Sequence, residues 1–353
     1  MNWKIEQINN KVDFDKLETF YKKKLPNFYH NRLSSNYLYW KLKENKKFNG
    51  VMLVATKNFK IIGSLSLTFK TIGINGKKAY VAEIGDCYVD FSVQRSLIVK
   101  NDLLSESSFE NRSIFGSLTS YILKIAKERN IEFIYGVPNN TSLQGFTKKL
   151  NFKTFDKFTL FNFILPSLKT SNQKKSYLNF LNYILKFYRF LLCKVNYRKL
   201  SFVIEKNFSS EEINIITKKR KNYYYLDKDE EYFKEKYKLN PEANFKFCKI
   251  YKNSNLVGLF VLKEDFSTQK IYIVDCLCLV DPVYLTRYIL LVVNSKYDMS
   301  VNFWEKSTNV NFFTRFIYTI FKRKKINIIY FNNINSDQYT FFNEFYLGHS
   351  DNF

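Results

Sequence analysis

A twenty-residue stretch, FIYGVPNNTSLQGFTKKLNF at positions 133–152, carries the clearest structural signal in the chain. Its apolar beginning predicts a short β-strand over 132–136, and the glycine and proline that follow end this strand abruptly. Asn139, Asn140 and Ser142 then offer short polar side chains of the kind that cap the N-terminus of a helix. A strand, a sharp turn and a helix are therefore expected in direct succession.

The flanking sequence alternates between the periodicities of helix and strand. Ile114, Leu118 and Ile122 recur at helical spacing, which predicts an amphipathic helix. The polar turn Lys57–Lys60 separates two β-rich runs and indicates a hairpin, and Asn75-Gly76 is a tight-turn signal. The order of elements predicts an α/β fold of mixed layers, with helices flanking a mixed, mostly antiparallel sheet. The expected helices are 13–25, 34–43, 113–129 and 142–150, and the expected strands are 51–56, 61–69, 80–89, 132–136 and 154–164.

The chain contains an internal repeat. With an offset of 195 residues, Tyr37–Asn45 matches Tyr232–Asn240. Further along, Asp86 matches Asp275 if about six residues are dropped from the second copy. Two related α/β domains in tandem are therefore expected. The first is expected over 1–168 and the second over 201–353, with a linker over 169–200.

The linker is rich in Tyr, Phe and Leu, with Lys186, Arg189 and Lys194 interspersed. This composition predicts an amphipathic helix. Such a helix can fill the seam between two domains, which is the interpretation favoured here, because bridging helices need apolar faces. A basic amphipathic helix can also lie on a membrane surface, so peripheral membrane contact stays open as an alternative.

Composition narrows the classes of protein further. The chain has 353 residues, 46% of them hydrophobic, so a substantial core can form. The net charge of +24 comes mostly from lysines spread along the sequence, which is typical of a solvated surface, so nucleic acid is not the expected partner. There is no apolar signal core and no long apolar run, and a cytoplasmic location is expected. Cys276 and Cys278 lack a second Cys or His pair, so no metal site is expected.

The stretch 133–152 resembles the GNAT acyltransferases, and especially the subset linked to bacterial surface-polysaccharide gene clusters. The matching pieces are Tyr135-Gly136-Val137-Pro138-Asn139, Ser142, Gly145-Phe146 and Lys149-Leu150-Asn151-Phe152. The resemblance implies that two neighbouring strands splay apart and that the pantetheine arm of an acyl-CoA lies in the gap. It also implies cofactor contacts for Asn139, Asn140 and Ser142.

The run 83–89 resembles the fourth strand of these enzymes, whose backbone binds the pantetheine arm. The resemblance implies that Glu83 is the general base, which suits an amine nucleophile that must lose a proton. Asp86 is the alternative base, because it recurs in the second copy. Thr147 stands where many of these enzymes have an acidic tyrosine, so Tyr135 or Tyr88 is the expected substitute. The backbone contacts are expected at Cys87, Tyr88 and Val89.

The run 110–118 resembles the loop that binds the CoA pyrophosphate at a helix N-terminus. Two glycines of that loop are replaced by Asn111 and Ser113, and its leading basic residue is replaced by Glu110, which repels phosphate. The site is therefore expected to be remodelled or lost. The residues expected to contact the cofactor are Arg112, Ser113, Ile114, Phe115 and Gly116.

In the second copy, the run 227–241 resembles the opening of a GNAT domain, but Asp281-Pro282 stands where a phosphate loop is expected. This half is expected to be degenerate and to support the first.

Three functions remain open from the sequence. The favoured one is an N-acyltransferase that moves an acyl group, expected to be acetyl, from acetyl-CoA or another acyl-CoA to a small-molecule amine. The resemblance favours a nucleotide-linked or lipid-linked amino sugar of surface-polysaccharide biosynthesis as acceptor. The alternatives are an aminoacyl-tRNA-dependent transferase with a double GNAT-like fold and a non-catalytic binding or scaffold protein.

Overall fold

The structure is a computed structural model. It describes residues 3–26, 31–74, 77–90, 92–93, 113–163, 187, 191, 197–219, 225–226, 228–241, 244–265, 270–297, 300–306 and 320–332. The predicted turn at 75–76, almost all of the polar loop around 90–110, Arg112 and most of the linker lie outside the described residues.

The N-terminal half contains every helix and strand predicted for it, each within a few residues of the expected bounds. A strand at its beginning, β1, was not predicted. The elements are β1 Lys4–Ile8, α1 Lys11–Lys24, α2 Ser35–Tyr39, β2 Gly50–Lys57, β3 Lys60–Ile74, β4 Lys77–Val89, α5 Ile114–Glu128, β5 Phe133–Gly136, α6 Asn140–Lys149 and β6 Lys153–Phe163. A single π-helical turn, Trp40–Glu44, continues α2.

The C-terminal half repeats most of this order, which confirms the predicted duplication, but it has the extra strand β8, and the described residues between β12 and β13 include no counterpart of α6. Both copies of the β-hairpin turn have two residues with positive φ at the same offset: Asn58 and Phe59 at 49° and 61°, and Asn253 and Ser254 at 49° and 64°. The elements are β7 Leu200–Glu205, α8 Ser210–Lys219, β8 Tyr225–Leu226, α9 Glu230–Phe233, β9 Phe245–Lys252, β10 Asn255–Asp265, β11 Lys270–Cys278, α10 Pro282–Tyr297, β12 Ser300–Lys306 and β13 Ile320–Asn332. A second π-helical turn, Lys234–Lys238, continues α9.

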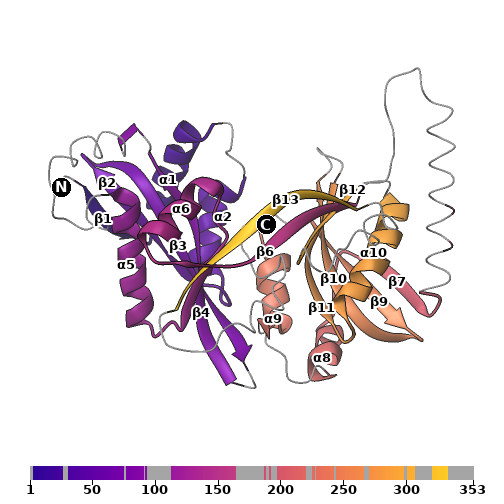
Figure 1. The fold of residues 1–353 in the computed structure, drawn as a ribbon. Coiled ribbons are helices and arrows are strands. Elements are labelled where there is room, and N and C mark those ends of the chain that lie inside the picture. Colours follow the sequence, from indigo (N-terminus) through magenta and orange to yellow (C-terminus); the bar gives the residue numbers. More distant parts are fainter. Residues whose placement is uncertain are drawn as a thin grey trace, which may run out of the picture.

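The two halves share one sheet of 13 strands because they exchange their last strands. β6 leaves the N-terminal half and pairs with β12, with Val301 opposite Phe163. β13 returns from the C-terminal half and pairs with β5, so that Tyr330 stands opposite Tyr135. Figure 1 shows β6 and β13 crossing together between the halves. By sequence, β6 lies within the predicted first domain, 1–168, and β13 within the predicted second domain, 201–353. In the structure, each of these strands also pairs with a strand of the other half.

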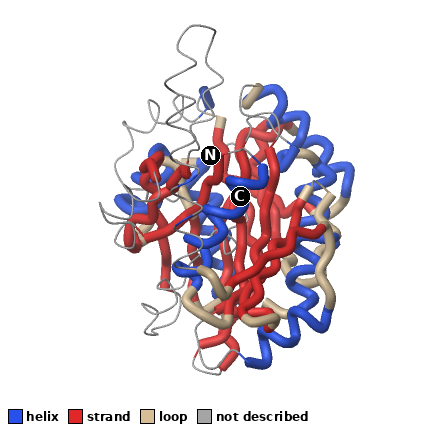
Figure 2. The backbone as a smooth tube through the Cα atoms, turned by 90° about the vertical axis from the view of Figure 1, so that its right-hand side faces the viewer, coloured by secondary structure: helices blue, strands red, loops and turns tan. Residues whose placement is uncertain are grey.

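Helices flank the sheet on both faces, as Figure 2 shows from the side of the C-terminal half. In the N-terminal half, β2 places Val51 and Leu53 against α5 and α6, and Met52 and Val54 against α1 and α2. This alternation is the period of two expected of a strand buried on both faces. The remaining apolar side chains of the first half join α8 and α9 of the second half in a central core. The helix α10 covers the other face of the second half.

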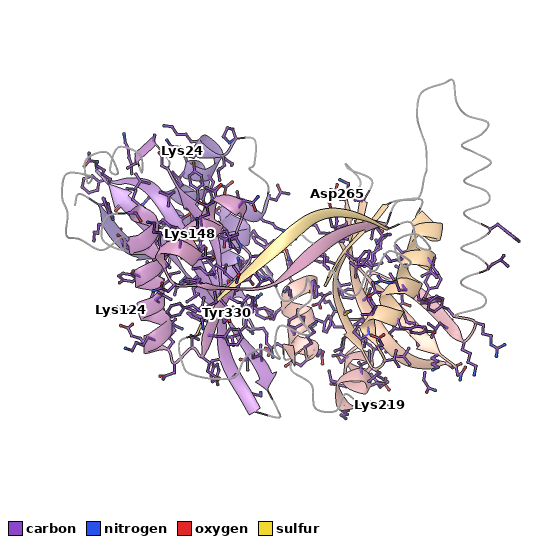
Figure 3. All side chains as sticks on the ribbon, viewed as in Figure 1. Lys24, Lys124, Lys148, Lys219, Asp265 and Tyr330 are labelled. Atoms are coloured by element: carbon purple, nitrogen blue, oxygen red, sulfur yellow. The ribbon has the colours of Figure 1, made fainter. Side chains whose placement is uncertain are left out.

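The positive charge is distributed over the surface. Figure 3 labels Lys24, Lys124, Lys148 and Lys219, which lie far apart on the outside of both halves. No helix within the described ranges is long and apolar enough to cross a membrane. In the linker, the described residues Phe187 and Leu191 are exposed, at 62% and 42%. That the linker fills the seam therefore stays a prediction.

Candidate functional site

The strands β4 and β5 are parallel neighbours that part at one point. Their pairing ends at Ile84 and Gly136, while β4 continues to Val89. A Cβ atom at Gly136 would lie 2.6 Å from Cγ2 and 3.0 Å from the carbonyl oxygen of Ile84, so only glycine allows this approach. Within the described part of the chain, residues 85–89 have no strand partner on this side. They also change from the burial of Val81–Ile84 to partial exposure, which leaves a gap beside the end of β4.

The Gly136→Ala variant is expected to be less stable by about 1–3 kcal/mol, because the added methyl group overpacks the contact with Ile84. Urea denaturation measures the change, with Thr141→Ala on the exposed side of α6 as the control. An unchanged unfolding midpoint for Gly136→Ala would mean that Ile84 moves aside without cost.

A β-bulge at Asp86 interrupts β4 at the gap. Ser64 of β3 stands opposite Tyr88 and Ser66 opposite Gly85, so two residues of β4, Asp86 and Cys87, face one residue of β3. Asp86 has a φ of 46°, in the left-handed region. The extra residue leaves backbone groups outside the ladder and resets which face each later side chain points to.

The carboxylate of Asp86 points to the α1/α2 face of the sheet, where two side chains bind it. The Ser66 hydroxyl donates to Oδ2 over 2.6 Å, and the Lys41 ammonium lies 2.8 Å from the same oxygen. Lys41 comes from the π-helical turn after α2. Beside them, the hydroxyls of Ser64 and Tyr21 lie 2.7 Å apart. Burial and the charge of Asp86 hold the pKa of Tyr21 well above its usual range, so Tyr21 stays protonated.

Sequence reasoning missed these partners of Asp86. The serines on β3 look like ordinary strand residues, and their approach to Asp86 depends on the bulge. The repeat did contain a signal for the lysine, because Lys41 and Lys236 occupy matching positions.

Glu83 lies on the face of the sheet that joins the central core. Its carboxylate is 2% exposed and accepts a 2.5 Å hydrogen bond from Lys70. The ammonium of Lys70 also lies 5.8 Å from the ring centre of Phe48 and 5.5 Å from that of Tyr135. Tyr135 is itself fully buried. Glu83 and Tyr135 therefore lie together, below the half-exposed segment of β4 rather than on it.

Cys87, Tyr88 and Val89 form the half-exposed end of β4. Burial and the neighbouring charge of Asp86 raise the pKa of the Cys87 thiol to about 12, so it is protonated at neutral pH. The ring of Tyr88 packs edge-on against Phe20 of α1, with centroids 5.5 Å apart. Partial burial and the charge of Asp90 raise the pKa of Tyr88.

The N-terminus of α5 lies beside the end of β4. A Cβ atom at Gly63 would meet Ile114 Cγ2 at 2.9 Å and the carbonyl oxygen of Tyr88 at 3.2 Å, so helix and strands are in close contact. Ser113 caps the helix, and its hydroxyl accepts the Gly116 amide at 2.8 Å. The other first-turn amides of a helix have no intrahelical partner, and with the helix dipole they favour an anion. Phe115 is half-buried next to them.

The start of α5 packs against the second half of α6, and the N-terminus of α6 has its own cap. Asn139 caps it and accepts the amide of Ser142 at 2.8 Å and its hydroxyl at 2.9 Å. The ring of Phe115 packs edge-on against Phe146 at 4.8 Å and covers Gly145, where a Cβ atom would lie 2.7 Å away. Asn139 and Asn140 are exposed. The predicted polar helix start is thus present, and its asparagine serves as the cap.

The matching place in the C-terminal half is closed. The end of β11, from Val274 to Cys278, is buried throughout, whereas the end of β4 is half-exposed. The bulge of β11 is at Val274, because Val261 stands opposite Asp275 and Leu262 opposite Ile273. In the first half the bulge is at Asp86, which matches Asp275 in the repeat, so the two bulges differ by one position. At the start of α10, the Asp281 carboxylate accepts the amide of Val283 at 3.0 Å. A carboxylate at this helix start repels phosphate, so the geometry favours a ligand only in the N-terminal half.

The chain combines a duplicated mixed sheet with, in its first half, splayed parallel strands beside a bulge and a helix N-terminus at the gap, and solved GNAT proteins share its fold. The sequence matches no family model and no curated protein. Solved structures show the same fold at low identity. A tandem GNAT protein from the clavulanic acid biosynthesis pathway has a TM-score of 0.54 and 10% identity, with 95% of this chain and 100% of that one covered.

Two further structures are similar. A GCN5-related glucosamine N-acetyltransferase region of a fungal multi-domain β-N-acetylglucosaminidase has a TM-score of 0.57 and 11% identity, over 93% of this chain and 38% of that one. N-myristoyltransferase from Saccharomyces cerevisiae with bound myristoyl-CoA has a TM-score of 0.55 and 11% identity, over 94% and 79% of the two chains.

Proposed function

We propose that the chain is an acyl-CoA-dependent N-acyltransferase whose active site lies in the N-terminal half. The observation that carries the proposal is the gap between β4 and β5, with the bulge at Asp86 on one side and the N-terminus of α5 on the other. The free backbone groups of residues 87–89 suit the amides of a pantetheine arm. The first turn of α5 suits the pyrophosphate, with Arg112 as a further contact.

In this proposal the acceptor amine approaches from the α1/α2 face, where the Asp86 carboxylate lies. The nitrogen attacks the thioester carbonyl, a C–N bond replaces the C–S bond, and Asp86 accepts the proton from nitrogen. Tyr88, which is protonated and half-exposed at the strand end, supplies the proton to the departing CoA sulfur. Cys87 is a protonated thiol, which favours direct transfer over an acyl-cysteine intermediate.

Asp86 is preferred to Glu83 as base because of their surroundings. Both carboxylates are paired with a lysine, but the Glu83 side chain is 2% exposed in the central core, whereas that of Asp86 is 11% exposed and lies at the bulge, where β4 becomes partly exposed. The tandem and glucosamine-specific proteins of the same fold support an acetyl donor and an amino-sugar acceptor. An amino sugar destined for surface polysaccharide, acylated in the cytoplasm, remains the preferred acceptor.

Calorimetric titration with acetyl-CoA tests the proposal. The wild type is expected to bind saturably, and Ser113→Asp is expected to bind about tenfold more weakly or worse. Aspartate caps a helix as well as serine, so α5 keeps its start, while the new charge repels the pyrophosphate as Asp281 would in the second half. Ser113→Thr keeps a neutral cap and is the matched control.

The other outcomes decide between the alternatives. If the wild type binds no acetyl-CoA but binds aminoacyl-tRNA, the tRNA-dependent transferase replaces this proposal. If it binds neither, the chain is a non-catalytic member of the fold.

A further inference from the structure

The turn that closes the hairpin of β2 and β3 contains an unusual residue. Lys57 stands opposite Lys60 in the register, and the two residues between them, Asn58 and Phe59, have φ values of 49° and 61°. Turns of this type favour asparagine and glycine, because both central residues are left-handed. A bulky side chain in that region is strained. Phe59 is therefore an unfavourable choice for the turn itself.

The side chain of Phe59 also lies outside the core. Its relative exposure is 106%, whereas the next most exposed large apolar side chains among the described residues, Val12 and Phe187, are 62% exposed. Single exposed apolar side chains are common on protein surfaces. Here, however, full exposure is combined with a strained backbone, and neither packing nor turn geometry accounts for the residue. This combination points to a contact outside the molecule.

The second copy of the hairpin shows that the fold does not require this residue. Its turn, Asn253-Ser254, has φ values of 49° and 64°, close to those of the first copy, and has serine in the place of Phe59. Lys252 stands opposite Asn255, whereas the first copy has a lysine on both sides of the turn. The same turn therefore forms without the aromatic ring and without the second lysine.

The turn in the first half is positively charged. Lys57 and Lys60 face each other across the hairpin, and like charges in that position are destabilising. Within the described part of the chain, neither of them forms an ion pair. On the neighbouring strand β1, Lys4 stands opposite Thr56 and is paired with Glu6. An exposed ring between two lysines is complementary to a surface that is anionic outside and apolar beneath, which describes an anionic lipid bilayer.

The turn lies at the same edge of the first half as the proposed active site. Gly63 of β3 stands opposite Val89, the last residue of β4, and lies against Ile114 at the start of α5. Because β3 begins at position 60, the turn projects about 10 Å beyond the end of β4. Lys24, which binds the Asp90 carboxylate just after β4, is labelled toward the top of the first half in Figure 3. A surface that contacts the turn therefore lies close to the end of β4.

We infer that residues 57–60, the hairpin tip of the first half, dock the chain on an anionic membrane surface. Phe59 inserts among the lipid headgroups, and Lys57 and Lys60 contact the lipid phosphates. One ring and two lysines give weak, reversible binding. Resting on the proposed function, the docked chain holds the end of β4 at the headgroups, so the acceptor is an amine carried by a lipid rather than by a free nucleotide.

Co-sedimentation of the full chain with lipid vesicles tests the docking without acetyl-CoA or an acceptor. One set of vesicles is phosphatidylcholine alone, and the other is an equal mixture of phosphatidylcholine and phosphatidylglycerol. The wild type is expected to bind the anionic vesicles about tenfold more tightly than the neutral ones, or better, because the two lysines add their attraction to that of the ring.

The double variant Phe59→Ser, Lys60→Asn gives the first hairpin the turn sequence of the second, residues 252–255. It is expected to fold, because the second copy forms that turn with the same geometry, and to bind anionic vesicles about tenfold more weakly or worse. The matched control, Tyr121→Ser with Lys124→Asn, removes one exposed ring and one exposed lysine from α5. It is expected to bind as the wild type does.

The variant Phe59→Trp reports on insertion directly. Compared with the wild type, its additional fluorescence is expected to shift to shorter wavelength with anionic vesicles and to be quenched by brominated lipid, because the ring moves from water into the bilayer interface.

Two results would overturn the docking: a wild type that does not bind anionic vesicles, or a double variant that binds them as tightly as the wild type does. The acetyl-CoA titration is independent of both. If the chain binds vesicles through the hairpin tip but binds no acetyl-CoA, the docking holds, while the lipid-carried acceptor is overturned together with the proposed function.

Discussion

The Asp86→Asn variant is expected to lower the turnover number for acetyl transfer by a factor of about 10² to 10⁴, the usual contribution of a general base. Asparagine keeps the size of the side chain, and its oxygen can still accept from Ser66, so the bulge is expected to persist. It cannot take a proton from the amine. Release of the CoA thiol, followed with glucosamine and glucosamine 6-phosphate as acceptors, measures the rate.

The affinity for acetyl-CoA separates this effect from misfolding. It is expected to stay at the wild-type level in Asp86→Asn, because the carboxylate is not among the groups proposed to bind the pantetheine arm or the pyrophosphate. Glu83→Gln is the comparison, since it tests the base that the family resemblance implies. If Glu83→Gln abolishes turnover and Asp86→Asn does not, the proton acceptor is Glu83.

The local elements of the fold were predictable because their signals are local. The periodicity of Ile114, Leu118 and Ile122 depends only on α5 itself, and the cap at Asn139 depends only on the three residues that follow it. The repeat was visible because hairpin turns such as Asn58-Phe59 keep their spacing in both copies. Such features survive in a single sequence.

The strand exchange was not predictable in the same way. The pairing of β6 and β13 depends on residues more than a hundred positions apart in the sequence, such as Tyr135 and Tyr330. The exchange also explains why the halves share a central core. β5 lies between β4 and a strand of the other half, so each half completes the sheet of the other.

In the candidate site, too, the residue types were predictable from the sequence but their contacts were not. Asp86 was a candidate because it recurs in the second copy. The face to which its side chain points could not be predicted, because it depends on the bulge opposite Ser64–Ser66, where Asp86 itself has a positive φ. The partnership of Glu83 with Lys70 was equally hidden, because the two residues meet only through the pairing of β3 and β4. Register, rather than residue type, separates the two candidate bases.

The Lys228→Met variant is expected to lose about 3–5 kcal/mol of unfolding free energy, because it leaves a buried carboxylate without its cation. The Lys228 ammonium lies 2.5 Å from Asp275 Oδ1, and both side chains are almost fully buried. Tyr232 and Tyr237 each donate to the other oxygen at 2.6 Å. Urea denaturation measures the loss. Lys234→Met, on the exposed side of the neighbouring turn, is expected to change stability by no more than about 0.5 kcal/mol.

The pH dependence gives this prediction a second test. Burial alone raises the pKa of Asp275, but the charges of Lys228 and Lys236 and the hydrogen bonds outweigh it and hold the pKa below its ordinary value. The wild-type pair therefore stabilises the fold above the unfolded-state pKa of about 3.9, and that contribution is lost as pH falls through the folded-state value. In Lys228→Met the cation is missing, so burial is expected to raise the pKa of Asp275. Protonation of Asp275 then removes the buried charge and makes the variant more stable. The difference in unfolding free energy between the two proteins is expected to decrease as the solution is acidified toward pH 4. A difference that does not change with pH would mean that the variant loses stability through packing rather than through charge.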